Sequence, residues 1–537
     1  MTTTNCKMPG LWLLALAAAS VLGSGSASAA DASADKATAP PASEDHFKVE
    51  DQASEGSVTI DGRKIDYLTH AGTLIVHAKD WDDVPQNASK DEKLPPAEAS
   101  MFYAAYFSKD KTSAARPITF LFNGGPGSAT IWLHMGAFGP KRVLTPGDTH
   151  PGAAPYSIVS NEFSLLDASD LVFIDAPGTG FSRISGKDKE KAFYGIEADA
   201  QAFADFIQQF LSKYSRWNSP KFLFGESYGT TRNAKLIEVL ETERFTDFNG
   251  VINLSQIEIW DASPDQPEGN PGVDLPYLLA LPTYAATAWY HHRTTGAPKE
   301  LPALLDEVER FALNEYAVAL LAGSTLDAAA RHAVAVKLHN YTGLAIEYIE
   351  KANLRVSGGE FSHNLRADGD ITVGRLDTRF AGPTIDPLGK EAEYDPQFAA
   401  IGSAYMAAFN SYVRGELKFS PNRIFKTLPR EIGEAWDIDR HTLGREFKAP
   451  NLLPDLATAM KYNPRLKVML NAGYYDLATP FYQGVYELQQ LPIPAQLRSN
   501  IEYKFYESGH MVYAHEPSLK ALHGSVADFI RRASSAN

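Results

Sequence analysis

The pentapeptide Gly225-Glu-Ser-Tyr-Gly229 is the segment whose residue types and spacing point most directly to chemistry. Glycines two residues before and two after a serine are typical of a sharp strand-to-helix turn that exposes a nucleophile, because the crowded backbone leaves no room for side chains. The pattern alone arises by chance roughly 0.1 to 0.2 times in a chain of this length. Its surroundings strengthen it, since an apolar strand is predicted over 221–224 and a helix over 230–240. Ser227 is therefore the predicted nucleophile.

A serine nucleophile needs a base, and the base needs an acid that orients it. In folds that carry this turn, the acid and then the histidine follow the serine, each after a late strand. Asp476 follows a predicted strand over 466–470, and His510 follows one over 501–505. The predicted catalytic triad is Ser227, Asp476 and His510. Two other histidines are expected to have surface or structural roles: His134 and His515.

The glycine-rich loop 123–127, Asn-Gly-Gly-Pro-Gly, follows a predicted apolar strand over 117–122. Acyl transfer needs two N–H donors for the developing oxyanion, one directly after the nucleophile and one from the loop after an earlier strand. Tyr228 supplies the first donor by its position, and loop 123–127 can supply the second. An ordinary tight turn is the alternative for this loop, and it would be favoured if the predicted triad were absent.

Three short strands are predicted to be apolar on both faces, over 117–122, 170–174 and 221–224. Such strands are expected where helices cover both sides of a parallel sheet, and segment 195–214 has the apolar spacing of one such helix. Glycine-rich turns after the strands gather loops along one sheet edge, where open α/β folds build their sites. The predicted fold class is α/β, an α/β-hydrolase fold with a mostly parallel central sheet, helices on both faces and an inserted helical cap.

Changes in composition divide the chain into parts. Segments between 47 and 108 are predicted to be strands near a sheet edge, and the region after Trp260 is first Pro-rich and then helical in pattern. Because strand patterns return near residue 466, the core is predicted to be discontinuous. The expected parts are a signal peptide over 1–29, a disordered linker over 30–45, the first part of the hydrolase core over 46–261, a cap over 262–445 and the second part of the core over 446–537.

The N-terminal segment predicts export. Lys7 precedes an apolar stretch over 11–22, and small residues then end in Ala27-Ser-Ala29, which is the pattern of a secretory signal with its cleavage site. The stretch is too short for an ordinary membrane-spanning helix. We expect a periplasmic or extracellular protein without a membrane anchor after signal cleavage, and a retained anchor is the alternative. The sequence does not indicate the oligomeric state.

Charge and cysteine content exclude several classes of function. The net charge of −15 and the pI near 5.4 disfavour contact with phosphate backbones, so nucleic-acid binding is not expected. Cys6 is the one cysteine, and it precedes the predicted cleavage site. The mature chain is then expected to have no disulfide, no cysteine-bound zinc and no cysteine nucleophile. Neither a cofactor nor a metal is expected.

Five motifs, in order, resemble those of the serine carboxypeptidase family. They are NGGPGS at 123–128, DAPGTGFS at 175–182, GESYG at 225–229, AGYYD at 472–476 and GHMV at 509–512. The resemblance is much weaker inside the predicted cap. It implies an α/β-hydrolase that acts on peptide substrates as a serine-type carboxypeptidase, removing C-terminal residues through an acyl-enzyme on Ser227.

The resemblance also implies roles for individual residues. The triad would be Ser227, Asp476 and His510, and the N–H groups of two residues would form the oxyanion hole: Gly125 and Tyr228. The carboxylate at the peptide C-terminus would be received by Asn123, the backbone of Gly124 and Glu226. Met511, next to the base, would line the pocket for the leaving residue.

The sequence departs from the family pattern at positions around these residues. Ala137 stands where a second glutamate of the family helps to hold the substrate carboxylate. Ser128 and Thr479 stand where the family has cysteines, and Tyr513 replaces the proline after GHMV. The segment after the elbow, Gly229-Thr-Thr-Arg232, also differs. These changes leave the hydrolytic residues in place and bear on specificity for a free C-terminus.

The absence of a carboxyl partner at Ala137 leads to an expectation for Glu226. Carboxyl groups that share a proton raise one apparent pKa, so without the partner we expect Glu226 to ionise at lower pH and to repel a substrate carboxylate. Arg232 is a candidate compensating cation, although a salt-bridge role at the surface or core edge is favoured for it. Weaker discrimination between peptide acids and peptide amides should follow.

Three other functions are alternatives to a carboxypeptidase. The same triad can serve an esterase, an amidase or an acyltransferase whose substrate has no free carboxylate. Proline-releasing aminopeptidases also carry a GGPG loop, but their motifs around the nucleophile match less well. A catalytically inactive binding module on a hydrolase scaffold usually lacks a triad residue, whereas all three predicted residues are present here.

Overall fold

The computed structural model describes residues 46–79, 81, 96–110, 115–419, 422–442, 445–447 and 450–535. The predicted signal peptide, the predicted linker and Cys6 lie outside the described residues. Within the described ranges, no helix has both the length and the apolar character that crossing a bilayer requires.

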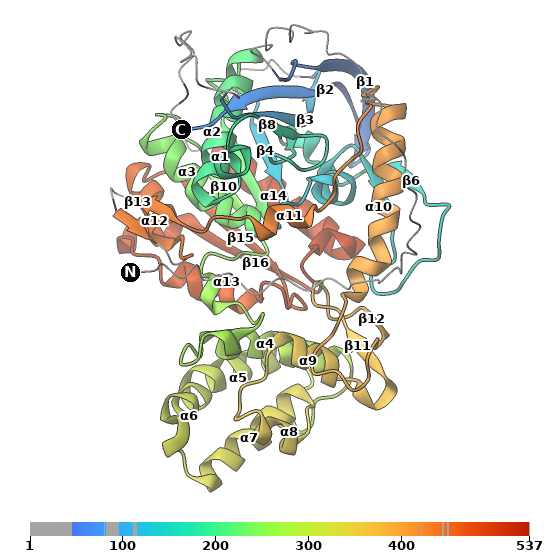
Figure 1. Ribbon diagram of the computed structural model, residues 1–537. Coiled ribbons are helices and arrows are strands. Elements are labelled where there is room, and N and C mark those ends of the chain that lie inside the picture. Colours follow the sequence, from blue (N-terminus) through green and yellow to red (C-terminus); the bar gives the residue numbers. More distant parts are fainter. Residues whose placement is uncertain are drawn as a thin grey trace, which may run out of the picture.

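A mixed sheet, of ten strands in the described part of the chain, forms the centre of the core (Figure 1). Its strands are β1 (Asp51–Ile60), β2 (Arg63–His77), β3 (Glu98–Ser108), β4 (Ile118–Phe122), β7 (Asp170–Ile174), β8 (Arg183–Ser185), β9 (Lys221–Glu226), β10 (Gly250–Leu254), β15 (Lys467–Gly473) and β16 (Ile501–Tyr506). Their order is β1-β2-β3-β7-β4-β9-β10-β15-β16, and β8 pairs with β3. The first three strands pair antiparallel at one edge, and the strands from β7 to β16 run parallel.

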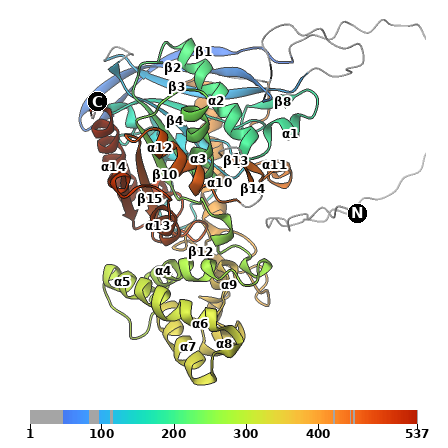
Figure 2. The ribbon, with the colours of Figure 1, turned by 90° about the vertical axis from the view of Figure 1, so that its left-hand side faces the viewer.

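Helices cover both faces of this sheet (Figure 2). They are α1 (Lys189–Phe193), α2 (Ile196–Lys213), α3 (Tyr228–Thr242), α10 (Pro396–Gly415), α11 (Arg430–Glu434), α12 (Leu453–Tyr462), α13 (Phe481–Gln489) and α14 (Glu516–Ser535). Helices α2, α3 and α12 share one apolar cluster with the sheet, and α10 and α14 share another. Helices on both sides explain why every residue of β4, β7, β9 and β10 is buried and why most of them are apolar. The chain therefore has the predicted α/β-hydrolase fold.

A separate group of helices lies below the core in both ribbon views (Figures 1 and 2). It comprises α4 (Leu275–Tyr290), α5 (Leu301–Phe311), α6 (Ala317–Ala322), α7 (Ala328–Thr342), α8 (Ile346–Lys351) and α9 (Gly358–Asn364). These helices enclose an apolar cluster of their own. A second cluster joins α4 and α5 to Ala472 near the end of β15 and to Tyr475 just after it, and so attaches the helical domain to the core.

Helix α10 lies inside the range 262–445 that the sequence assigns to the cap, but it packs against the core sheet. Its buried residues, including Ile401, Tyr405 and Phe409, belong to the same apolar cluster as α14. Short antiparallel pairs complete the described elements: β5 (Lys141–Val143) with β6 (Ile158–Ser160), β11 (Ile371–Val373) with β12 (Ala381–Pro383), and β13 (Arg440–Thr442) with β14 (Arg445–Phe447).

Candidate active site

Ser227 occupies a strained turn between β9 and α3. Its φ of 61° and ψ of −130° lie in a region that side-chain-bearing residues seldom adopt, as expected for an elbow that presents a nucleophile. A Cβ at Gly225 would lie 2.1 Å from the carbonyl oxygen of Gly229, so only glycine fits there. The Ser227 N–H donates to the carbonyl of Leu254 at 2.9 Å, which ties the turn to the end of β10.

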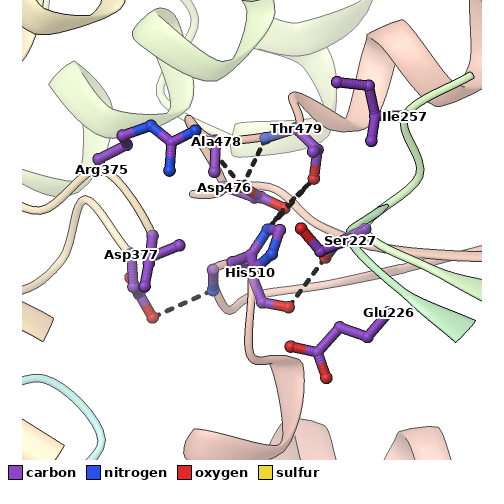
Figure 3. Close-up of polar contacts among 12 residues, drawn as sticks. Glu226, Ser227, Ile257, Arg375, Asp377, Asp476, Ala478, Thr479 and His510 are labelled. Atoms are coloured by element: carbon purple, nitrogen blue, oxygen red, sulfur yellow. Dashed lines mark hydrogen bonds and ion pairs between the residues drawn. The ribbon is translucent and has the colours of Figure 1, made fainter. Parts of the chain in front are cut away.

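Asp476 and His510 lie on the loops that follow β15 and β16, next to the elbow. His510 Nδ1 and Asp476 Oδ2 are 2.9 Å apart, and both side chains are buried. Burial favours the neutral imidazole, but the Asp476 carboxylate outweighs this effect and raises the pKa of His510. Figure 3 shows these two residues and Ser227 gathered at one end of the sheet. With Nδ1–H directed at the carboxylate, Nε2 is the nitrogen that can take a proton from a serine.

Thr479 is a site residue for which the sequence indicated no role. Its hydroxyl donates to Asp476 Oδ2 at 2.8 Å and lies 3.2 Å from His510 Nδ1. The N–H groups of Ala478 and Thr479 both donate to Asp476 Oδ1 at 2.9 Å. The acid is therefore held by a side chain and two backbone donors from its own loop.

A segment from outside the motifs, 374–380, holds the base loop; we call it the clamp segment. The carbonyl of Leu376 accepts the His510 N–H at 2.6 Å, and the carboxylate of Asp377 accepts the Gly509 N–H at 3.1 Å (Figure 3). Arg379 pairs with Asp377 at 2.6 Å, and both side chains are buried. This segment was not among the predicted site residues, and its one local signal is an aspartate between two close arginines, Arg375-Leu-Asp-Thr-Arg379.

The loop after β4 lies directly against the start of α3. A Cβ at Gly124 would lie 2.4 Å from the backbone nitrogen of Tyr228, so the absence of a side chain permits the contact. Tyr228 is the first residue of α3, where N–H groups have no partner within the helix. The structure thus brings together the two segments that carry the predicted donors, Gly125 and Tyr228.

Arg232 and Asp199 form an ion pair beneath this loop. Arg232 Nε lies 2.7 Å from Asp199 Oδ2, and Arg232 Nη1 donates to the carbonyl of Asn123 at 2.8 Å. The guanidinium lies 4.3 Å from the centre of the Phe203 ring, and the arginine is 1% exposed. Arg232 therefore fills the favoured salt-bridge role, at a fully buried position rather than at the surface, and its charge is directed at Asp199 and away from any substrate carboxylate.

Glu226, which precedes the nucleophile, is buried among polar groups. Asn123 Nδ2 donates to its Oε2 at 2.9 Å, and the Tyr513 hydroxyl donates to Oε2 and Oε1 at 2.8 and 3.1 Å. Burial raises the pKa of Glu226 to about 7, although His510, Tyr513 and Asn123 all favour its ionised form. The expectation that Ala137 lets Glu226 ionise at lower pH compares it with the family's carboxyl pair, and burial holds the pKa of Glu226 above its ordinary value even without that partner.

The structure also places Asp175 and the two histidines for which the sequence predicted no catalytic role. Asp175 of the DAPGTGFS motif accepts the N–H of Thr130 at 2.8 Å, which fixes the end of the glycine-rich loop, and burial raises its pKa to about 6. His134 has the expected structural role: it lies 2.6 Å from the Tyr106 hydroxyl, and burial lowers its pKa to about 3. His515 contacts the hydroxyl of Ser518 at 2.8 Å.

Two other positions named in the sequence analysis, Met511 and Ala137, lie among apolar side chains. Met511 and Ala137 are buried in the cluster that also holds Tyr405 and Tyr513. Among the residues that the structure describes, no group of three or more histidine, cysteine, aspartate or glutamate side chains is placed to hold a metal ion.

Comparisons with known proteins identify relatives of one family. The model of the serine carboxypeptidase family matches residues 93–280. Serine carboxypeptidase-like 3 from Arabidopsis thaliana is 27% identical over 183 residues, which cover 34% of this chain and 38% of the relative. The pheromone-processing carboxypeptidase KEX1 from Saccharomyces cerevisiae is 29% identical over 167 residues, covering 30% and 20%. The matches thus span less than two fifths of each relative.

Solved structures with a similar arrangement are also found, at low identity. The peroxisomal alpha-beta-hydrolase Lpx1 from Saccharomyces cerevisiae is 9% identical, with a TM-score of 0.35 and coverage of 87% of this chain and 89% of that chain. A soluble variant of monoglyceride lipase from the same organism is also 9% identical, with a TM-score of 0.33 and coverage of 84% and 99%. By the family model and the sequence relatives, residues 93–280 of this chain are similar to the serine carboxypeptidase family, a family of serine hydrolases.

Proposed function

We propose that the chain is a serine carboxypeptidase that releases C-terminal residues from peptides. Ser227 Oγ attacks the carbonyl carbon of the last peptide bond, and His510 Nε2 takes the hydroxyl proton. His510 then gives the proton to the leaving amino group, and the C-terminal residue departs. Water, activated by the same imidazole, hydrolyses the acyl-enzyme and restores the serine. Asp476 orients the imidazole and stabilises its charged form.

The observation that carries this proposal is the buried carboxyl of Glu226 beside the nucleophile. A carboxyl whose pKa is raised to about 7 is neutral in mildly acidic solution, so its O–H can donate to the carboxylate at the end of a peptide. Asn123 and the backbone of Gly124 would complete this subsite. A substrate without a free carboxylate would gain nothing from such a group, which is why we favour a carboxypeptidase over an esterase or amidase.

The other site residues take roles that fit the same reaction. The N–H groups of Gly125 and Tyr228 would receive the oxyanion of the tetrahedral intermediate. The side chain of Met511, which follows the base in the chain, would contact the leaving residue. Peptides are thus the proposed partners, and the residues named supply the whole reaction without a cofactor.

Mass spectrometry of a mixed peptide pool after incubation tests the proposal. Stepwise loss of residues from C-termini, and from no other position, is expected at pH 5 to 6. The same peptides with amidated C-termini should be cleaved at least tenfold more slowly, and the Ser227→Ala variant is the control for contaminating proteases. Internal cleavage, release from N-termini, or equal cleavage of acids and amides at every pH would contradict a carboxypeptidase.

We also propose that the protein is exported to the periplasm or the extracellular space, on the pattern of residues 1–29. N-terminal sequencing of the secreted or periplasmic protein should give a start just after Ala29. A mature protein that retains Met1 and stays with the cytoplasmic fraction would contradict export.

A further inference from the structure

Tyr513 is a buried polar side chain of the site that the proposed reaction does not use. It lies in the short helix Val512–Ala514, directly after Met511, and is 3% exposed. Its hydroxyl contacts both carboxyl oxygens of Glu226, at 2.8 and 3.1 Å. A single donor shared between two oxygens fixes both the direction and the plane of the carboxyl group.

Asn123 approaches the same carboxyl from the loop after β4. Its Oδ1 accepts the backbone N–H of Leu133 at 3.1 Å, so its amide nitrogen must face Glu226, where it donates to Oε2 at 2.9 Å. Glu226 is therefore held between Asn123 and Tyr513. The Asn123 amide nitrogen can only donate, and the Tyr513 hydroxyl donates to the ionised carboxylate.

Small residues make room for this arrangement. A Cβ at Gly136 would lie 2.3 Å from the hydroxyl of Tyr405 and 2.7 Å from Cδ2 of Tyr513. Gly136 precedes Ala137, the position at which the family pattern has a second glutamate. Two phenol rings thus fill the volume beside residues 136–137, and a phenol contacts Glu226.

The charged and titratable groups around Glu226 come from several elements. His510 and Asp476 act on it from the loops after β16 and β15, Tyr513 from its short helix and Tyr405 from α10. Burial raises the pKa of both tyrosines far above the neutral range, so both phenols stay protonated. A donor that never ionises stabilises the carboxylate form of Glu226 at every pH of interest.

We propose that Tyr513 is a positioning residue for Glu226 and that it sets the upper pH limit at which the enzyme recognises a peptide's terminal carboxylate. The inference rests on the proposed carboxypeptidase function. Below that limit the O–H of Glu226 donates to the substrate carboxylate, while Tyr513 donates to the other Glu226 oxygen and aims the group. Above the limit Glu226 gives its proton to solvent, and two carboxylates then face each other.

The test measures kcat/KM for one N-blocked dipeptide as free acid and as amide, from pH 5 to 9. In the wild type the acid-to-amide ratio should fall about tenfold per pH unit above about pH 7, as Glu226 ionises. Taking the ratio removes the shared titration of His510. In Tyr513→Phe the pH at which the ratio falls should move upward by about one unit, because the carboxylate loses a stabilising donor.

Matched variants separate this effect from general damage. Tyr284→Phe removes the hydroxyl of a buried tyrosine in α4 that donates to the carbonyl of Val356 at 3.1 Å, and should leave the ratio unchanged. Tyr513→Met has a flexible side chain in place of the ring. The pH at which the acid-to-amide ratio falls should move upward as much in Tyr513→Met as in Tyr513→Phe. Glu226→Gln should abolish the pH dependence of the ratio.

Three results would overturn the inference. An unchanged midpoint in folded Tyr513→Phe or Tyr513→Met would show that the phenol does not tune Glu226. A loss of acid hydrolysis at all pH values, with the amide rate retained, would show that Tyr513 binds the substrate itself. Equal losses on acid and amide would show a structural role only. By contrast, a wild type without any free-acid preference would refute the carboxypeptidase function itself.

Discussion

Replacing Arg232 by methionine should strongly destabilise the protein at neutral pH. Arg232 and Asp199 are 1% and 0% exposed, and two contacts of 2.7 and 3.2 Å join them. Methionine fills much of the same volume, but Asp199 then keeps the Tyr228 hydroxyl, 3.3 Å away, as its side-chain donor. Removing one partner of a buried ion pair costs about 3 to 5 kcal/mol in the free energy of unfolding.

The size of this loss should depend on pH. Burial already raises the pKa of Asp199 in spite of Arg232, and removing the arginine raises it further. The unfolded chain has an ordinary aspartate with a pKa near 3.9. A raised pKa in the folded state means that the penalty is largest at neutral pH and is relieved as the pH falls. The gap between Arg232→Met and wild type should therefore narrow below pH 7, by at most about 1.4 kcal/mol per unit.

Urea unfolding at pH 7 and pH 5 measures both effects. The double variant Arg232→Met with Asp199→Asn should recover part of the loss, because no unpaired charge then remains. The control is Arg244→Met, which breaks a half-exposed pair with Asp205 of the same 2.7 Å length and should cost less than about 1 kcal/mol. A loss below about 1 kcal/mol in Arg232→Met, equal at both pH values, would refute this account of the buried pair.

Three more variants probe the site directly. Ser227→Ala should abolish labelling by a fluorophosphonate probe and lower kcat about a thousandfold or more, with an unchanged melting curve; equal labelling would exclude Ser227 as the nucleophile. Thr479→Val should move the acid limb of the pH–rate profile to higher pH. Asp476 without its hydroxyl donor holds the imidazolium of His510 more strongly. An acid limb at the same pH as in the wild type would show that Thr479 does not act on the base. Gly509→Ala should cost about 1 to 3 kcal/mol in thermal unfolding, since its Cβ would lie 2.4 Å from the clamp segment, and full stability would show that the loops separate freely.

The elements that carry the predicted triad could be read from the sequence because each has a local signature. Ser227 lies in a turn that demands glycines at fixed offsets, and Asp476 and His510 follow apolar strands in the order that the fold requires. The helix predicted over 195–214 is confirmed as α2, since its apolar spacing matches the face that it buries. Strand β10 was missed, because a short run such as Gly-Val-Ile-Asn-Leu does not distinguish a strand from a buried helix segment.

The features that the sequence could not reveal are contacts between residues that lie far apart in the chain. Asp377 and Gly509 are 132 residues apart, and no spacing rule connects them. Tyr513 was recognised only as a departure from a family pattern, whereas its contact with Glu226 joins two residues that are 287 positions apart in the chain. The rise in the pKa of Glu226 was not foreseen, because it depends on the extent of burial, which one sequence does not give.

The clamp segment links the position of the predicted base to a part of the chain that lies just after the helical domain. It follows α4 to α9 in the chain, and its backbone holds the loop of His510 before that loop can present the base. Contacts between segments this far apart tend to form late in folding, because bringing the segments together costs chain entropy before the contacts stabilise the fold. The loop of His510 therefore reaches its final position only when a segment more than a hundred residues earlier in the chain is also in place.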